Sequence, residues 1–286
     1  MRIEKAVLRP TLALAGAALG LGWSVMAVQA QEALGAPRNW QLGMQPTVTE
    51  IGHQVATFHD WLVWIITAIS LFVLVLLLAI IFKFGEKKNP VPSRTTHNTM
   101  LEVAWTVVPV LILVAIAIPS FRVLRTQLVI PPHDLVVKAT GYAWYWGYEY
   151  PGEQAGFKFD SNMILDKDLK PGQPRLMAVD NEMVVPVNKV VRLQITAADV
   201  LHNFAVPAIG MRLDAVPGRL NETWFKADRE GVFYGHCSEL CGNGHPYMPI
   251  TVRVVSEQAY AAWVAEAKTK YARIDGSAPA KLANAQ

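Results

Sequence analysis

Residues 236–249 read HCSELCGNGHPYMP and contain both cysteines of the 286-residue chain. Cys237 and Cys241 lie four positions apart, His245 follows four positions later, and Met248 three beyond that. Thiolate, imidazole and thioether together form a soft donor set, which selects copper over harder metals. Zinc fits less well, because zinc sites usually lack methionine and often use C-x2-C pairs. The stretch therefore predicts a copper site in a loop between strands.

A further ligand must come from elsewhere in the fold, and His202 in DVLHNFAVPAIG is the candidate. It lies at the end of a strand-like run, far enough upstream for a neighbouring strand to pass beside the loop. A lone histidine at a strand end is ordinarily structural. A blue-copper site uses one cysteine, two histidines and a weak axial methionine. The second cysteine would let two copper ions share two bridging sulfurs, so we expect a dinuclear site.

A disulfide between Cys237 and Cys241 is the structural alternative, since an even cysteine count in an oxidising compartment permits one. It would account for the cysteines but not for the nearby His245 and Met248 or for His202.

The chain that must position these residues begins with an apolar segment typical of a secretory signal peptide. Arg2, Lys5 and Arg9 precede LALAGAALGLGW, and small residues at Val28 and Ala30 form a cleavage pattern. We expect residues 1–30 to be a cleaved signal peptide. A third spanning helix is the weaker alternative, because glycines interrupt the run and it is short for a bilayer.

Two further apolar segments, Trp61–Phe82 and Leu101–Phe121, are long enough to cross a membrane. The loop between them carries four basic residues, whereas residues 31–60 carry only Arg38. The positive-inside rule therefore places the loop in the cytoplasm and everything after Phe121 outside. A buried core helix is the alternative for each segment.

The remainder predicts an all-β soluble domain. Short β-rich runs separated by Gly, Pro, Asn and Asp are typical of a sandwich or barrel, and Ser256–Arg273 predicts a C-terminal helix. We expect an N-terminal periplasmic segment at 31–60, a transmembrane hairpin at 61–126, the β domain at 127–256 and a helix with tail at 257–286. Residues 127–286 hold 16 basic and 17 acidic residues, and no nucleic-acid motif is present.

The ordered motifs GYAWYWGYEY, VLHNFAVPAIGMRLDAVPGRLNETWF and YGHCSELCGNGHPYMPI, placed after a two-helix hairpin, resemble subunit II of the haem-copper cytochrome c oxidases. The resemblance covers nearly the whole chain after the signal peptide. It implies a membrane-anchored all-β protein whose cupredoxin-like β-barrel or sandwich holds the dinuclear CuA centre.

The resemblance also implies roles for single residues. Cys237 and Cys241 would bridge the coppers, His202 and His245 would each ligate one, and Met248 would be an axial ligand. Glu239 would give its backbone carbonyl to copper and its carboxylate to Mg²⁺ at the interface with subunit I. His236 departs from the family pattern, where Gln is more frequent, and is interpreted as a neighbour of the site.

Trp144 resembles the family's electron-input tryptophan, although an aromatic-rich strand by itself indicates core packing. Four acidic residues resemble the patch that attracts cytochrome c: Glu149, Asp160, Asp180 and Asp214. Glu102 is an ionisable residue within a membrane span, which by default indicates a pathway for ions or protons. Its position near the cytoplasmic end equally allows its side chain simply to reach the membrane–water interface. In the family a glutamate here lies at the entrance of a proton channel, with His97 nearby.

The resemblance implies the electron-input subunit of a proton-pumping cytochrome c oxidase in the bacterial inner membrane. Its partners would be subunits I and III and cytochrome c, with oxygen chemistry in subunit I. No C-x-x-C-H haem motif is present. A membrane-anchored copper chaperone is the main alternative, and a metal-free structural subunit and a copper reductase are others. The hairpin, Met248 and the AWYW run disfavour the chaperone.

Overall fold

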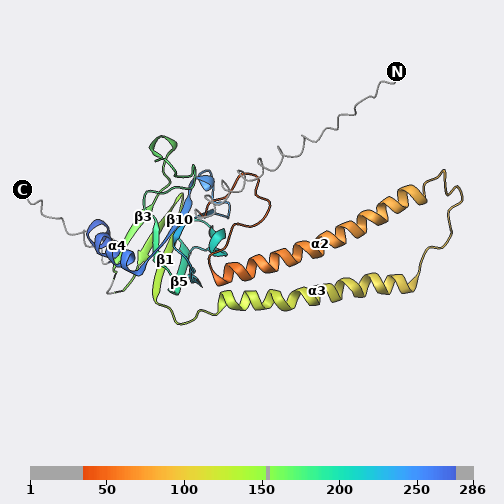
Figure 1. The fold of residues 1–286 in the computed structure, drawn as a ribbon, viewed down its shortest axis with the longest axis horizontal. Helices are drawn as coiled ribbons and strands as arrows, with labels where there is room; N and C mark the ends of the chain where they lie inside the picture. The colour runs from red at the N-terminus through yellow and green to blue at the C-terminus, as the bar shows by residue number, and fades with distance from the viewer. Residues whose placement is uncertain (1–34, 153–154, 275–286) are drawn as a thin grey trace, which may run out of the picture.

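The structure, a computed structural model, describes residues 35–152 and 155–274. The signal peptide expected at 1–30 and the tail after Asp275 lie outside the described residues. Two long helices, α2 (Glu50–Lys83) and α3 (Thr99–Leu128), run side by side away from a β-domain (Figure 1). The apolar stretch of each helix is exposed on all sides within this chain. Such helices require an apolar surrounding, which a bilayer provides.

The first sheet of the β-domain contains six strands in the order β11-β3-β2-β1-β5-β8. Their bounds are β1 Leu135–Tyr142, β2 Tyr145–Tyr150, β3 Phe157–Ser161, β5 Val191–Ala197, β8 Asn221–Phe225 and β11 Ala272–Arg273. β1 pairs with β5 in parallel, and the other pairs are antiparallel. β5 alternates buried and half-buried residues along VRLQITA, as a strand with one face on a core must.

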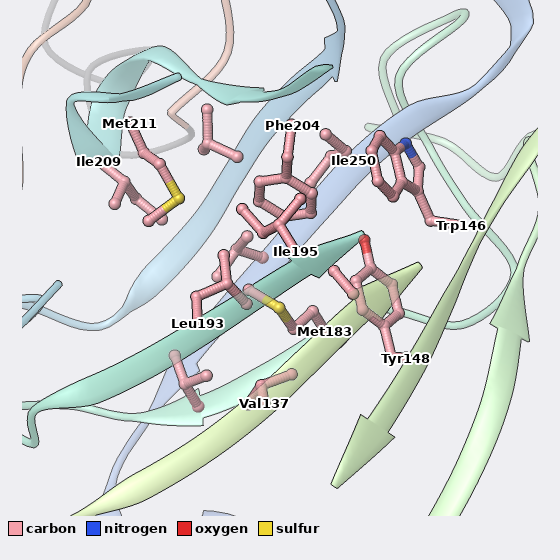
Figure 2. Close-up of a cluster of buried hydrophobic side chains, with 14 of the residues drawn as sticks. Val137, Trp146, Tyr148, Met183, Leu193, Ile195, Phe204, Ile209, Met211 and Ile250 are labelled. Carbon is pink, nitrogen blue, oxygen red and sulfur yellow. The ribbon is translucent and has the colours of Figure 1, made fainter. Parts of the chain in front are cut away.

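The second sheet contains five strands in the order β4-β10-β9-β6-β7. Their bounds are β4 Met183–Pro186, β6 His202–Val206, β7 Met211–Ala215, β9 Gly231–Cys237 and β10 Pro249–Val255. The two sheets pack face to face, and side chains from both fill the space between them (Figure 2). Trp146 and Leu193 of the first sheet meet Phe204 and Ile250 of the second, and all four are at most 1% exposed.

Helix α4 (Glu257–Lys270) packs against β4 of the second sheet and, through Trp263, against aromatic side chains of β2 and β3 in the first. The Ser256 side chain caps it by accepting a hydrogen bond from the Ala259 amide, as Ser256 at the predicted start requires. Trp263 packs edge-on against Tyr150 at 5.2 Å and Phe157 at 5.5 Å. The expected architecture, a two-helix hairpin followed by a cupredoxin-like sandwich and a C-terminal helix, is confirmed.

The hairpin is attached to the sandwich through both helices. α2 begins at Glu50, eleven residues before the expected span, because its first turn packs on the sandwich and not in the bilayer. The Thr49 hydroxyl caps this turn and donates to the Ile209 carbonyl at 2.6 Å. At the end of α3, Trp224 Nε1 donates to the Thr126 carbonyl at 2.9 Å. These contacts hold the helices against the domain.

Candidate metal centre

The candidate ligands come together at one end of the second sheet. β6 begins at His202 and β9 ends at Cys237, and the two strands are antiparallel neighbours with Phe204 opposite Cys237. The loop from Cys237 to β10 then supplies the remaining donors. One ligand atom each from His202, Cys237 and Cys241 lies within 4.8 Å of the others. The strand pairing therefore joins His202 to a loop that starts 35 residues later.

The two cysteines are free and buried, with their sulfurs 3.8 Å apart. The disulfide alternative is therefore not formed in this structure. Met248 Sδ lies 3.5 Å from Cys241 Sγ, and Met248 is 1% exposed. Burial of three sulfurs in one loop leaves little room for water, which suits a soft metal ion.

Each sulfur of the pair has an imidazole and a weak donor beside it. Cys237 Sγ lies 3.9 Å from His202 Nδ1 and 3.3 Å from the Glu239 carbonyl oxygen. Cys241 Sγ lies 3.6 Å from His245 Nδ1, in addition to its contact with Met248. This doubled donor set fits two ions that share two thiolates better than it fits one tetrahedral ion.

Asp199 holds His202 in the orientation that this centre needs. Its carboxylate lies 2.8 Å from His202 Nε2, so Nδ1 is the nitrogen that faces the sulfurs. On the other side, the ring packs on β1, where a Cβ at Gly141 would lie 2.8 Å from His202 Cδ2. A carboxylate on the second nitrogen is the usual support of a metal-binding histidine. Sequence reasoning missed Asp199, although its position three residues before His202 was a usable signal.

The two thiols differ sharply in their acidity. Burial opposes ionisation of Cys237, but hydrogen bonds from His202 and from backbone amides outweigh it and lower the pKa of Cys237 to about 6. Burial and the neighbouring Cys237 raise the pKa of Cys241 to about 12. Burial also opposes protonation of His202, yet Cys237 and Asp199 raise its pKa. Two thiolates 3.8 Å apart would repel each other, and a cation between them would offset this repulsion.

Trp144 lies directly on the metal-site loop. Its Nε1 donates to the Cys241 carbonyl at 3.0 Å, and its side chain is 40% exposed. The indole covers Gly242 and Gly244; a Cβ at 244 would collide with the ring, and one at 242 would lie 3.0 Å from it. The loop therefore needs glycine at 244 to let the ring approach. Trp144 thus connects the protein surface to a backbone group of Cys241.

His236 is exposed, whereas its neighbour Cys237 is buried. Successive strand residues point to opposite faces, so the His236 side chain leaves the site. Glu239 is exposed, and its backbone carbonyl lies beside Cys237 Sγ.

Two of the four expected docking acids, Glu149 of β2 and Asp160 of β3, lie on the outer face of the first sheet, and Asp180 lies in the loop before β4, where it accepts from the Asn162 amide at 2.7 Å. Burial and then the charge of Asp180 raise the pKa of Asp160. Glu149 belongs to the same face, where it forms an ion pair with Lys138 at 3.1 Å. Asp214 instead lies on β7 of the second sheet and accepts from Asn203 Nδ2 at 2.6 Å. Asp199, next to Trp144, adds a carboxylate that sequence reasoning did not include.

Glu102 lies in the first turn of α3, which Asn98 caps through hydrogen bonds to the Met100 and Leu101 amides. His97 immediately precedes the cap and is exposed. The start of α3 lies at the end of the hairpin that is away from the β-domain (Figure 1).

Comparisons with known proteins agree with this arrangement. Residues 135–255 match the family model "Cytochrome C oxidase subunit II, periplasmic domain", and residues 37–123 match the model of its transmembrane domain. A probable cytochrome c oxidase subunit 2 of Rickettsia bellii is 52% identical over 80% of this chain and 85% of its own length. Cytochrome c oxidase subunit 2 of Cereibacter sphaeroides is 48% identical over 88% and 89%.

Among solved structures, the periplasmic domain of subunit II of cytochrome oxidase (CoxB) of Bradyrhizobium japonicum is similar to part of this chain. It is 58% identical, covers 50% of this chain and 100% of its own, and has a TM-score of 0.47.

Proposed function

The chain belongs to the cytochrome c oxidase subunit II family, and from this membership we propose that it is the electron-input subunit of a proton-pumping cytochrome c oxidase. It accepts electrons from cytochrome c at a dinuclear CuA centre and passes them to haem in subunit I, where oxygen is reduced to water. The observation that carries the proposal is the doubled donor set, in which each of two neighbouring sulfurs has one imidazole and one weak donor.

The metal ligands in this proposal are His202, Cys237, Cys241, His245, Met248 and the carbonyl of Glu239. A bound copper pair supplies a one-electron carrier. The protein keeps the pair dry by burying Cys237, Cys241 and Met248. Asp199 fixes the tautomer of His202, so that Nδ1 stays free of a proton and available as a donor.

Trp144 is the proposed point of electron uptake, because it is exposed on one side and hydrogen-bonded to Cys241 on the other. Glu149 and Asp160 on the outer face of the first sheet, together with Asp180 in the loop before β4, supply negative charge for a basic cytochrome c, as does Asp214 from the second sheet. Such fields act mainly on the rate of encounter and fade with added salt.

The hairpin anchors the domain as a two-span membrane protein. We place it in the bacterial inner membrane, with a cleaved signal peptide at 1–30 and the β-domain at 127–256 on the periplasmic side. Glu102 is proposed at the entrance of a proton channel in subunit I, and the Glu239 carboxylate on Mg²⁺ at the subunit interface. Subunit III completes the complex. The exposure of Glu239 leaves its carboxylate free for such an interface.

The test compares histidine variants of the full chain loaded with copper. His202→Ala should lose the two-copper content and the paramagnetic resonance pattern of one electron shared equally by two copper nuclei. His236→Ala is the matched control and should keep both, because its side chain points away from the site. One copper per wild-type chain with a mononuclear signal would contradict the dinuclear centre and favour the copper chaperone.

A further inference from the structure

A groove with a volume of about 1020 Å³ lies where the hairpin meets the β-sandwich. The start of α2, the end of α3 and the end of β8 with the turn after it form its walls. Its apolar lining includes Trp61 of α2, Val123 of α3 and Trp224 of β8. The Trp224 hydrogen bond to the Thr126 carbonyl fixes this side of the groove. The groove is separate from the metal centre, whose residues do not line it.

The groove lies at the outer surface of the bilayer. α2 has 34 residues, whereas a span needs about 20. Its charge-free stretch begins at Trp61, so the preceding turns, which also line the groove, extend out of the hydrocarbon. Tryptophan is enriched at this level of a membrane, where its polar N–H meets water and its ring meets lipid. Lipid headgroups are therefore the molecules that surround the opening.

The groove carries two cations that this chain does not neutralise. Arg122 and Lys226 line it, and within residues 35–152 and 155–274 neither has a hydrogen-bonding or ion-pair partner for its side chain. The two acids of the lining do have partners. Glu50 accepts from Gln54 Nε2 at 3.2 Å, and Asp228 lies 3.5 Å from His53 Nε2. The lining therefore holds two cations and two carboxylates, and the carboxylates already have hydrogen-bonding partners whereas the cations are open to a ligand.

We propose that this groove binds one membrane phospholipid. Its phosphate accepts hydrogen bonds from Arg122 and Lys226, and its acyl chains lie against Trp61 and Val123 and continue along the hairpin. Arginine suits a phosphate because its planar guanidinium presents two parallel donors. Inorganic phosphate would pair with the cations but leave the apolar wall in water, so a phospholipid fits the groove better than free phosphate.

The test uses the purified oxidase complex with the full chain, washed with increasing detergent, and counts retained phospholipids by native mass spectrometry. Arg122→Gln/Lys226→Gln should retain one phospholipid fewer per chain than wild type, with an apparent affinity lowered by about tenfold or more, because each charged hydrogen bond contributes substantially. Arg125→Gln is the matched control. It removes an exposed arginine one turn further along α3 that does not line the groove, and should leave retention unchanged.

A second variant separates the apolar contact from the charges. Val123→Trp fills the apolar wall while keeping both cations, and should also lose the phospholipid. Unchanged copper content in all variants shows that the fold is intact. Equal lipid retention in wild type and the double variant would overturn the proposal, as would an equal loss in Arg125→Gln. Displacement of the lipid by inorganic phosphate at equal concentration would overturn the assignment to a lipid.

Discussion

Replacing Gly244 by alanine should separate Trp144 from the metal-site loop without touching a ligand. An ideal Cβ at this position would lie 2.5 Å from Trp144 Cε3 and nearer still to Cγ and Cδ2. Unbonded carbon atoms prefer a separation of about 3.5–4.0 Å, so the indole must withdraw by about 1 Å. The 3.0 Å hydrogen bond from Nε1 to the Cys241 carbonyl then approaches the limit of a real bond.

The expected loss is in the rate of electron uptake. Overpacking of this kind costs about 1–3 kcal/mol of stability, which a folded domain tolerates. A displacement of about 1 Å can lower the rate of a well-positioned reaction by up to about 100-fold, and we expect at least about tenfold here. Copper content should not change, because Gly244 itself supplies no donor.

The assay is stopped-flow reduction of the copper centre by reduced cytochrome c in the full complex. Gly43→Ala is the control, since no atom lies within 4 Å of a Cβ at that position. A Gly244→Ala complex that takes up electrons at the wild-type rate would refute the role of the Trp144 contact. Loss of copper together with the rate would also refute it, because the defect would then lie in the ligands.

Two further predictions concern carboxylates. Asp199→Asn should weaken copper binding about 10–100-fold in chelator competition, because the amide orients His202 less firmly. An unchanged copper affinity would contradict the role of Asp199 in orienting His202. Gln194 and then Arg192, against the opposing effect of burial, lower the pKa of Glu222 below its ordinary 4.5. The contribution of ionised Glu222 to folding stability is therefore full above pH 4.5. It is lost as the pH falls through the pKa that Glu222 has in the folded protein. Glu222→Gln should lower the free energy of unfolding by about 1–2 kcal/mol at neutral pH. In denaturant titrations, this free energy should also fall less steeply as the pH is lowered. Asp166→Asn removes an exposed ion pair and should change neither the free energy of unfolding nor its pH dependence. Equal changes in the two variants would contradict the stabilising role of Glu222.

Local patterns were sufficient to predict several elements. The charge-free run Trp61–Phe82 predicts a spanning helix because sufficient length and an apolar composition are what a helix needs to cross a bilayer. Ser256 predicts the start of α4 because its hydroxyl can satisfy a free amide of the first turn. Hydropathy could not predict the start of α2 at Glu50, because the turns before Trp61 are held by contacts with Ile209 and the rest of the sandwich.

The sequence by itself determined which donors are available, since Cys237, Cys241, His245 and Met248 lie within one loop whose short length keeps them together. Only the tertiary structure decided what surrounds them. β6 and β9 pair across a long stretch of chain, and that pairing brings His202 and with it Asp199 to the sulfurs. Trp144 arrives from the other sheet. Such contacts depend on strand order and register, which are set by burial over the whole domain and leave no mark in any short segment.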